Sequence, residues 1–219
     1  MSGTAHGVGA RQLTVAWVQR ALARPLPGAA AHAPMMPQPR PGESRLIPPA
    51  NCRHSGVMVL LYPRRDRLFF PLTQRSEGLA DHSGQVSLPG GGREGDEPLE
   101  QTALRETYEE LGVPPTAVEV IGRLSPLYVP VSNYCIHPYV GYVASPPRLR
   151  PNPREVADVR EVALTALLAN DNRGVEVRDE QGFVGGRRVP YMTLNDWRVW
   201  GATAMILNEL ALVLKVASS

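Results

Sequence analysis

One stretch, GGGREGDEPLEQTALRETYEELGV at 90–113, constrains this chain more than any other part of it. Its glycines predict a loop whose backbone can approach a ligand closely, because glycine has no side chain to obstruct that approach. A helix is predicted over Pro98–Leu111, since proline suits the first turn of a helix, while Gly112 and Pro114 suit its end. The stretch therefore predicts a glycine-rich loop that leads directly into a short helix.

The predicted helix carries a concentrated acidic face. Each residue advances about 100° around a helix axis, so Glu106, Glu109 and Glu110 share one arc. The opposite arc is expected to be buried and holds Leu104, Thr107, Tyr108 and Leu111. Like charges at these spacings cost about 0.2–0.5 kcal/mol per pair. A solvated acidic face is one explanation, but the glycine loop and the adjoining Arg105 favour a bound divalent cation, for which carboxylates are preferred ligands.

The spacing of these residues resembles the Nudix box. That signature reads G, five residues, E, seven residues, then REUxEExGU, where U is a bulky aliphatic residue. Gly91, Glu97 and the run Arg105–Val113 match it, with Thr107 at the first U position as the one departure. The resemblance implies an α/β fold, the Nudix α/β/α sandwich with a mixed β-sheet. It also implies metal-dependent hydrolysis of a nucleoside diphosphate linked to another group.

By position, the resemblance assigns a metal-binding role to the carboxylates of the box. The implied cofactor is Mg²⁺ or Mn²⁺, and the implied ligands are Glu106, Glu109 and Glu110. Arg105 is expected to orient these carboxylates through charge-assisted hydrogen bonds. Glu97 is expected to support the start of the helix and to pair with Arg105.

The general base that takes a proton from the attacking water is not fixed by the box. A base must be a carboxylate within reach of the water. Glu106 and Glu109 are candidates within the box, and Glu155, in NPREVADV, is a candidate outside it at the head of a predicted strand. An ordinary charge at a strand end is the other interpretation of Glu155. The expected catalytic residues are Glu106, Glu109, Arg105 and Glu155.

A second resemblance lies upstream, in PLTQRSEGLADHSGQVSLPGG at 71–91. This segment is similar to the extra motif of coenzyme A pyrophosphatases, LLTxR[SA]xxxRxxxGxxxFPGG, with departures at Pro71, Ala80 and Leu88. It implies hydrolysis of coenzyme A or acyl-coenzyme A to 3′,5′-ADP and 4′-phosphopantetheine or its acylated form. Ala80 replaces an arginine, so ADP-ribose, NADH or a nucleoside triphosphate remains an alternative substrate. The expected substrate-binding residues are Arg75, Ser76, Gly90 and Gly91.

A non-catalytic Nudix-fold module that senses nucleotides is a further alternative. Such modules usually lose acids of the box, whereas every acid of the box is present here. The intact box therefore favours an enzyme.

Composition limits the partners. A net charge of +2 is too small to indicate nucleic acid or membrane binding, and no apolar run is long enough to span a bilayer. We expect a cytoplasmic protein with a small-molecule nucleotide as its substrate. Cys52 and Cys135 are far apart and show no metal-ligand spacing, so they are predicted to be reduced and buried.

The chain is predicted to divide into two parts. Residues 1–50 hold a helix over Gln12–Ala23 and a proline-rich extended arm over Pro25–Pro49. This part could cover the sheet or mediate a homodimer, and the pattern leaves both open. Residues 51–219 are the expected Nudix domain, which ends in a helix over Asp196–Val216 capped by Asn195 or Asp196.

Strands are expected wherever apolar β-branched runs lie between turn residues. The predicted strands are Ser55–Tyr62, Leu68–Arg75, Gln85–Leu88, Val118–Leu124, Ile136–Val143, Glu155–Leu164, Val175–Arg178 and Phe183–Val189. The first two are expected to form a hairpin, as are the last two, and Pro71 suggests an edge or a bulge in the second strand.

Overall fold

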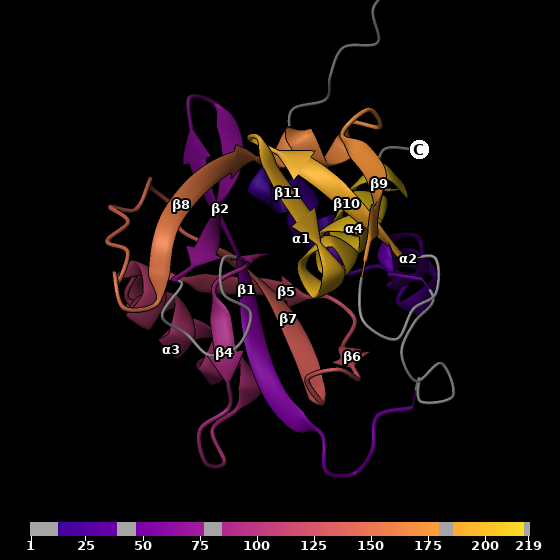
Figure 1. The fold of residues 1–219 in the computed structure, drawn as a ribbon. Coiled ribbons are helices and arrows are strands. Elements are labelled where there is room, and N and C mark those ends of the chain that lie inside the picture. The colour runs from indigo at the N-terminus through magenta and orange to yellow at the C-terminus, as the bar shows by residue number, and fades with distance from the viewer. Residues whose placement is uncertain (1–12, 39–46, 77–84, 180–185, 217–219) are drawn as a thin grey trace, which may run out of the picture.

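The computed structural model describes residues 13–38, 47–76, 85–179 and 186–216, and it shows a mixed α/β fold (Figure 1). The helices are α1 (Val15–Leu22), α2 (Ala29–His32), α3 (Leu99–Leu111) and α4 (Gly201–Val216), with 3₁₀ turns η1 (Ala33–Met35), η2 (Pro115–Ala117) and η3 (Leu164–Leu168). Within this part of the chain, no helix is both long enough and apolar enough to cross a membrane.

The strands form a large mixed sheet and a small antiparallel one. The large sheet holds β1 (Arg53–Arg64), β2 (Arg67–Arg75), β3 (Val86–Ser87), β4 (Gly90–Gly92), β5 (Glu119–Arg123), β6 (Leu127–Val129), β7 (Tyr134–Tyr142) and β8 (Val156–Ala163). Its path runs β3-β2-β1-β7-β5, with β4 beside β1, β6 beside β7 and β8 beside β2. Among the strand pairs that the structure describes in this sheet, only β1 and β7 run parallel. The small sheet is β9 (Arg173–Arg178), β10 (Arg187–Leu194) and β11 (Trp197–Trp200).

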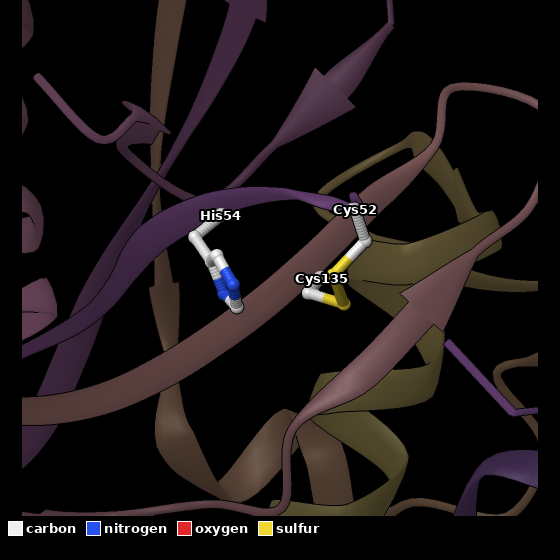
Figure 2. A group of neighbouring side chains, drawn as sticks. All are labelled: Cys52, His54 and Cys135. Atoms are coloured by element: carbon white, nitrogen blue, oxygen red, sulfur yellow. A yellow bond between two sulfur atoms is a disulfide. The ribbon is translucent and has the colours of Figure 1, made fainter. Parts of the chain in front are cut away.

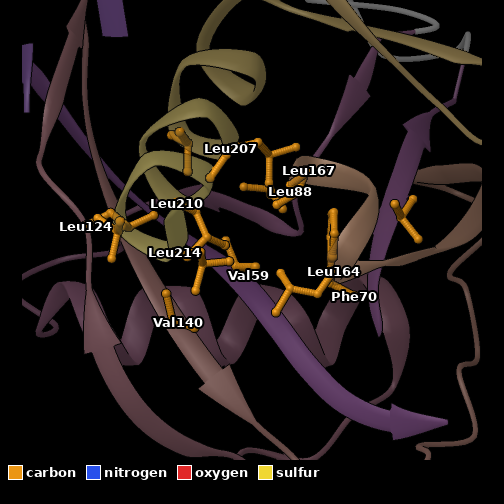
Figure 3. Packing of buried hydrophobic residues seen from close by; sticks show 14 of the residues in the cluster. Val59, Phe70, Leu88, Leu124, Val140, Leu164, Leu167, Leu207, Leu210 and Leu214 are labelled. Atoms are coloured by element: carbon orange, nitrogen blue, oxygen red, sulfur yellow. The ribbon is translucent and has the colours of Figure 1, made fainter. Parts of the chain in front are cut away.

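Strand β1 is buried on both faces, which explains its uninterrupted apolar sequence. Met58 and Leu60 pack with Leu104 and Leu111 of α3 on one face. The alternate residue Val59 packs on the other face, with the α4 cluster that includes Leu207, Leu210 and Leu214 (Figure 3). Successive side chains of a strand point to opposite faces, so this register fixes β1 between two helical layers. The α/β/α sandwich with a mixed sheet is confirmed.

The two predicted hairpins are present. Arg65 and Asp66, both with positive φ, form the two-residue turn between β1 and β2. β9 and β10 also pair antiparallel, although residues 180–185, which connect them, lie outside the described residues. Pro71 lies beyond the last β1–β2 pair, Tyr62 with Phe69, and there pairs with β8 instead. The missing N–H of Pro71 therefore costs the β1–β2 ladder no hydrogen bond.

The predicted start of the last helix is wrong. Asn195 and Asp196 have φ values of 46° and 65° and form the turn between β10 and β11, where Leu194 pairs with Trp197. They are turn residues rather than helix caps. Buried and less buried side chains alternate along β11, which is a strand period, and α4 begins only at Gly201.

The predicted extended arm is also wrong in its described part. α2 and η1 pack against α4, with Ala31, His32 and Met35 buried. Glu209 of α4 fixes this contact, because its carboxylate accepts hydrogen bonds from Gly28 N at 2.9 Å and from His32 Nε2 at 3.2 Å. Helix α1, predicted over Gln12–Ala23, contacts α4 and β5. Residues 13–38 therefore pack mainly against α4, and α1 also reaches β5 of the large sheet.

The prediction of two reduced cysteines is wrong. Cys52 and Cys135 form a disulfide with a Cα–Cα distance of 5.9 Å, across a sequence separation of 83 residues (Figure 2). The parallel pairing of β1 with β7 places His54 opposite Cys135. Cys52 lies two residues before His54, on the same side of the strand, and its sulfur can therefore reach that of Cys135. Cys135 is buried, as expected, with 7% of its surface exposed.

Candidate active site

The glycine loop forms the short strand β4, which lies between β1 and α3. Gly91 pairs with Gly56 of β1. A Cβ atom built on Gly91 would lie 2.5 Å from both carboxylate oxygens of Glu106. No real side chain tolerates that distance, so the sequence needs glycine here to let the Glu106 carboxylate reach the backbone.

Three carboxylates meet beside this loop. One oxygen each of Glu106, Glu110 and Glu155 lies within 4.8 Å of the other two. Glu106 and Glu110 come from α3, whereas Glu155 precedes β8. The structure thus brings together two predicted metal ligands with the predicted outside acid.

Glu155 is held in place by the turn at 151–155. Asn152 Nδ2 donates to Glu155 Oε1 at 2.8 Å, and Asn152 N donates to the Glu110 carbonyl at 2.9 Å. Arg150 N donates to the Leu111 carbonyl at 2.8 Å. The turn therefore binds the end of α3 and presents Glu155 toward the two helix acids.

The burial of these acids raises their pKa values. Burial raises the pKa of Glu110 to about 8; the nearby Arg75 charge works against this, and Glu106 and Glu155 add to it. Burial also raises the pKa of Glu106, against a hydrogen bond from Arg105. Repulsion among buried carboxylates is what a cation would remove.

Two buried polar atoms at this site have no hydrogen-bond partner among the described residues: Glu110 Oε2 and Arg75 Nε. An unpaired buried acceptor is costly unless something else satisfies it. Three carboxylates with an open oxygen form an all-oxygen donor set, which suits a hard divalent cation. The unpaired Arg75 Nε is a donor suited to a phosphate oxygen.

Arg105 organises the box, as predicted. It donates to Glu97 Oε1 at 2.8 Å, to Glu106 Oε1 at 2.9 Å and to the Gly92 carbonyl at 2.9 Å. The hydrogen bonds from Arg105 lower the pKa of Glu97 to about 2. The predicted pairing of Glu97 with Arg105 is thus confirmed.

Glu109 lies apart from the three clustered acids. Its Oε2 accepts a hydrogen bond from Arg105 Nη1 at 3.0 Å, and 43% of its side chain is exposed. Its assignment as a metal ligand or base therefore stays a prediction. In this structure the third acid of the cluster, beside Glu106 and Glu110, is Glu155.

The predicted division of α3 into two arcs is wrong at two positions. Glu110 is only 3% exposed, because the turn at 151–155 covers it, whereas Tyr108 is 53% exposed. Thr107 is buried as expected, and its hydroxyl donates to the Ala103 carbonyl at 2.7 Å. That bond satisfies the hydroxyl, which explains how threonine replaces an aliphatic residue of the box.

Ser76 lies at the end of β2 and ties this strand to the same turn. Its backbone N donates to the Glu155 carbonyl at 2.9 Å, and its Oγ donates to the Pro153 carbonyl at 3.2 Å. Arg75 and Ser76 therefore border the acids, and their roles in substrate binding stay predictions. Ala80 lies outside the described residues.

Asn152 is the site residue that the sequence did not identify. Two of its hydrogen bonds position Glu155 and satisfy the Glu110 carbonyl at the end of α3. The one available signal was its place three residues before Glu155, since asparagine often bonds a nearby group in a turn.

A family model and curated relatives match the chain over more than half of its length. The family model of the NUDIX domain matches residues 53–181. The chain is 39% identical over 160 residues to the "Uncharacterized Nudix hydrolase NudL" of Pectobacterium atrosepticum, covering 71% of this chain and 79% of that protein. It is 35% identical over 167 residues to the protein of the same name from Photorhabdus laumondii, covering 74% and 84%.

Solved structures overlap this one only in part. A Nudix hydrolase from M. smegmatis, RenU, overlaps with a TM-score of 0.45 and 23% identity, over 51% of this chain and 71% of that chain. The NUDIX domain of Shewanella oneidensis NrtR, complexed with ADP ribose, overlaps with a TM-score of 0.42 and 25% identity, over 53% and 76%.

Proposed function

This chain belongs to the Nudix hydrolase family, and from that premise we propose that it hydrolyses the pyrophosphate bond of coenzyme A or acyl-coenzyme A. The products would be 3′,5′-ADP and 4′-phosphopantetheine or its acylated form. The observation that carries the reaction is the cluster of Glu106, Glu110 and Glu155, in which a buried carboxylate oxygen has no partner among the described residues.

Nudix hydrolases generally use a divalent metal ion, and we propose Mg²⁺ or Mn²⁺ at this cluster, held by Glu106 and Glu110. When bound, such an ion neutralises the charge of the pyrophosphate and orients its oxygens. Arg105 fixes the Glu106 carboxylate from one side, and Gly91 leaves it room on the other. These contacts hold the ligand geometry before substrate arrives, which limits the reorganisation needed during the reaction.

Glu155 is our candidate for the general base. Its Oε1 is already oriented by Asn152 at 2.8 Å, and it lies within the cluster without belonging to α3. A carboxylate so placed can take the proton of the attacking water while the two helix acids bind the cation.

The substrate assignment rests on β2. Thr73, Arg75 and Ser76 are the motif residues that resemble those of coenzyme A pyrophosphatases, and β2 ends at the turn that carries Glu155. The unpaired Nε of Arg75 supports a contact with the pyrophosphate or with the adenosine phosphate. ADP-ribose, NADH or a nucleoside triphosphate would use the same acids, and the substitution at Ala80 favours testing them.

A substrate panel tests the proposal. The full chain is incubated with Mg²⁺ or Mn²⁺ and coenzyme A, acetyl-coenzyme A, ADP-ribose, NADH or ATP, and products are separated by chromatography. We expect 3′,5′-ADP from the coenzyme A compounds and the highest kcat/KM for one of them. The Glu110→Gln variant is the control for contaminating hydrolases. A higher kcat/KM for ADP-ribose, NADH or ATP would reject coenzyme A, and binding without turnover of any of these would indicate a sensing module.

A further inference from the structure

Two matching segments lie side by side where β1 and β7 begin. Cys52-Arg53-His54 enters β1, and Cys135-Ile136-His137 lies in β7. The cysteine and the histidine of each segment are two residues apart, so they share one face of their strand. The strands are parallel and place His54 opposite Cys135. The topology thus gathers the two sulfurs and the imidazole of His54 (Figure 2), and the imidazole of His137 contacts that of His54.

Three of these four side chains already lie close enough together to share a metal ion, and the fourth, His137, contacts one of them. The two Sγ atoms and one ring nitrogen of His54 all lie within 4.8 Å of one another. His54 Nδ1 lies 3.1 Å from His137 Nε2. A tetrahedral zinc site with ordinary bond lengths has nitrogen–nitrogen edges of about 3.3 Å and sulfur–sulfur edges of about 3.8 Å. The imidazole pair is therefore near its required spacing, and the sulfurs reach theirs once the disulfide opens.

The donor atoms select the ion. Thiolate and imidazole ligands favour Zn²⁺, whereas the all-oxygen cluster beside α3 favours Mg²⁺ or Mn²⁺. A disulfide-bonded sulfur is no thiolate, so zinc binding requires the reduced form. We propose that the reduced chain binds one Zn²⁺ through Cys52, His54, Cys135 and His137, and that the disulfide is the oxidised, zinc-free form of the same site.

Hydrogen bonds and a ring contact fix the backbone around His54, which carries one of these side chains. Arg53 N donates to the Asn133 carbonyl at 2.8 Å, and the Arg53 guanidinium lies 4.2 Å from the centre of the Tyr134 ring and donates to the Ser132 carbonyl at 2.9 Å. His54 in turn accepts a hydrogen bond at its carbonyl from Arg93 N at 2.9 Å. Ligands on hydrogen-bonded strands keep their geometry better than ligands on loops.

A disulfide that serves only as a covalent link would not require the two histidines. In the part of the chain that the structure describes, neither imidazole hydrogen-bonds to a carboxylate; they contact each other. Both strands contribute the same three-residue pattern, which brings two imidazoles beside two sulfurs. A metal ion bound by all four side chains explains this arrangement.

The test begins with the dithiol form. A trialkylphosphine opens the disulfide: the phosphorus takes the oxygen of one water and becomes the phosphine oxide, and the sulfurs receive its two electrons and the two protons of that water. Free thiols are then titrated, and circular dichroism confirms that the full chain remains folded. A disulfide that resists the phosphine in the folded chain, even when the chain is prepared under reductant throughout, would overturn the proposal.

Co²⁺ serves as the spectroscopic probe, followed by displacement with Zn²⁺. We expect one equivalent of Co²⁺ to give thiolate-to-cobalt charge-transfer absorption and the intense visible bands of a tetrahedral centre, and one equivalent of Zn²⁺ to remove both. The unreduced chain should give neither. A folded dithiol chain that shows no such absorption would refute the site.

Variants identify the ligands. Loss of a group that hydrogen-bonds to a metal ligand costs about 10–100-fold in metal affinity. Cys52→Ser, at the less buried cysteine, and His54→Gln remove a ligand itself, so each should weaken Zn²⁺ binding by more than that. His137→Gln should do the same. Glu106→Gln should leave the cobalt spectrum unchanged, because it alters only the acidic cluster. Charge-transfer bands that persist in the Cys52→Ser, Cys135→Ser double variant, or Zn²⁺ affinity unchanged in both histidine variants, would contradict the assignment.

Discussion

The carboxylate of Glu106 packs directly against the backbone of Gly91. Both of its oxygens would lie 2.5 Å from a Cβ atom at that position. Arg105 Nη1 holds the same carboxylate with a hydrogen bond of 2.9 Å. The position of the Glu106 carboxylate, a proposed metal ligand, is thus determined by an arginine on one side and by the absence of a side chain on the other.

Gly91→Ala should therefore impair catalysis more than stability. The added methyl must displace the Glu106 carboxylate, and a displacement of about 1 Å at an active site can cost about 10²-fold in rate. We expect kcat/KM to fall by about that factor and the affinity for Mn²⁺, measured by calorimetry, to fall with it. Gly92→Ala is the matched control, because its Cβ would meet only the Tyr134 hydroxyl, at 3.4 Å. Equal losses in the two variants would contradict this explanation.

Glu110→Gln should stabilise the metal-free protein while removing its activity. Burial raises the pKa of Glu110 to about 8, so between about pH 4.5 and pH 8 the folded state retains a proton that the unfolded chain has lost. The free energy of unfolding then decreases as pH rises through that window, by about 1.4 kcal/mol per unit at most. Glutamine does not titrate, so the variant should lack this decrease.

Urea unfolding of both proteins at pH 5 and pH 8, without metal, measures the effect. The difference in stability between variant and wild type should be larger at pH 8 than at pH 5. Mn²⁺ should stabilise the wild type more than the variant, because a ligand that binds only the folded state raises its stability. A variant less stable than the wild type at pH 8 without metal would show that the buried carboxylate serves the fold rather than a cation. Activity should fall by about 10²–10³-fold, as when a key charge stabiliser is removed.

Arg75→Lys tests whether the guanidinium contacts a phosphate. Lysine keeps the positive charge beside Glu110 but loses the planar donor group that includes the unpaired Nε. Hydrogen bonds to charged groups contribute about 1.5–3 kcal/mol, so kcat/KM for coenzyme A should fall by about 10–100-fold. Arg67→Lys is the control, because Arg67 is exposed at the far end of the same strand. Unchanged kcat/KM in Arg75→Lys would exclude a bidentate contact.

Fixed spacing made the core of the site predictable. The distances along the chain among Gly91, Glu97, Arg105 and Glu106 are set by one loop and one helix, so local rules place these residues together. The helix end at Gly112, with its φ of 71°, follows from the same local rules.

The features of the structure that the sequence did not predict depend mostly on contacts between segments far apart in the chain. Glu110 is buried by the turn at 151–155, and helical periodicity alone carries no information about that cover. The disulfide follows from the parallel register of β1 with β7, which joins segments 83 residues apart. The sequence at Asn195 and Asp196 is compatible with a helix cap and with a two-residue turn. The structure has the turn, and the alternating burial of the next four residues is that of a strand.

Glu209 joins α4 to the segment before β1. Glu209 is fully buried and accepts hydrogen bonds from His32, Gly28 N and Ser125 N. Burial alone would raise its pKa, but the hydrogen bonds from His32 and Ser125 outweigh it and hold the pKa below its ordinary value. Because the folded pKa is depressed, the stabilisation is present above the ordinary pKa of glutamate, about 4.3, and is lost as pH falls through the lower folded value.

Glu209→Gln should therefore lower the free energy of unfolding at pH 7 by about 1–3 kcal/mol, because the neutral amide is a weaker acceptor and brings donors of its own. The loss should shrink below about pH 4, where the wild-type carboxylate becomes protonated. Thermal unfolding from pH 7 to pH 3 measures this difference. Glu119→Gln, at an exposed position of β5, is the control and should change stability little at any pH. A deficit in Glu209→Gln that is the same at pH 7 and pH 3 would mean that the charge of Glu209 contributes nothing to the contact.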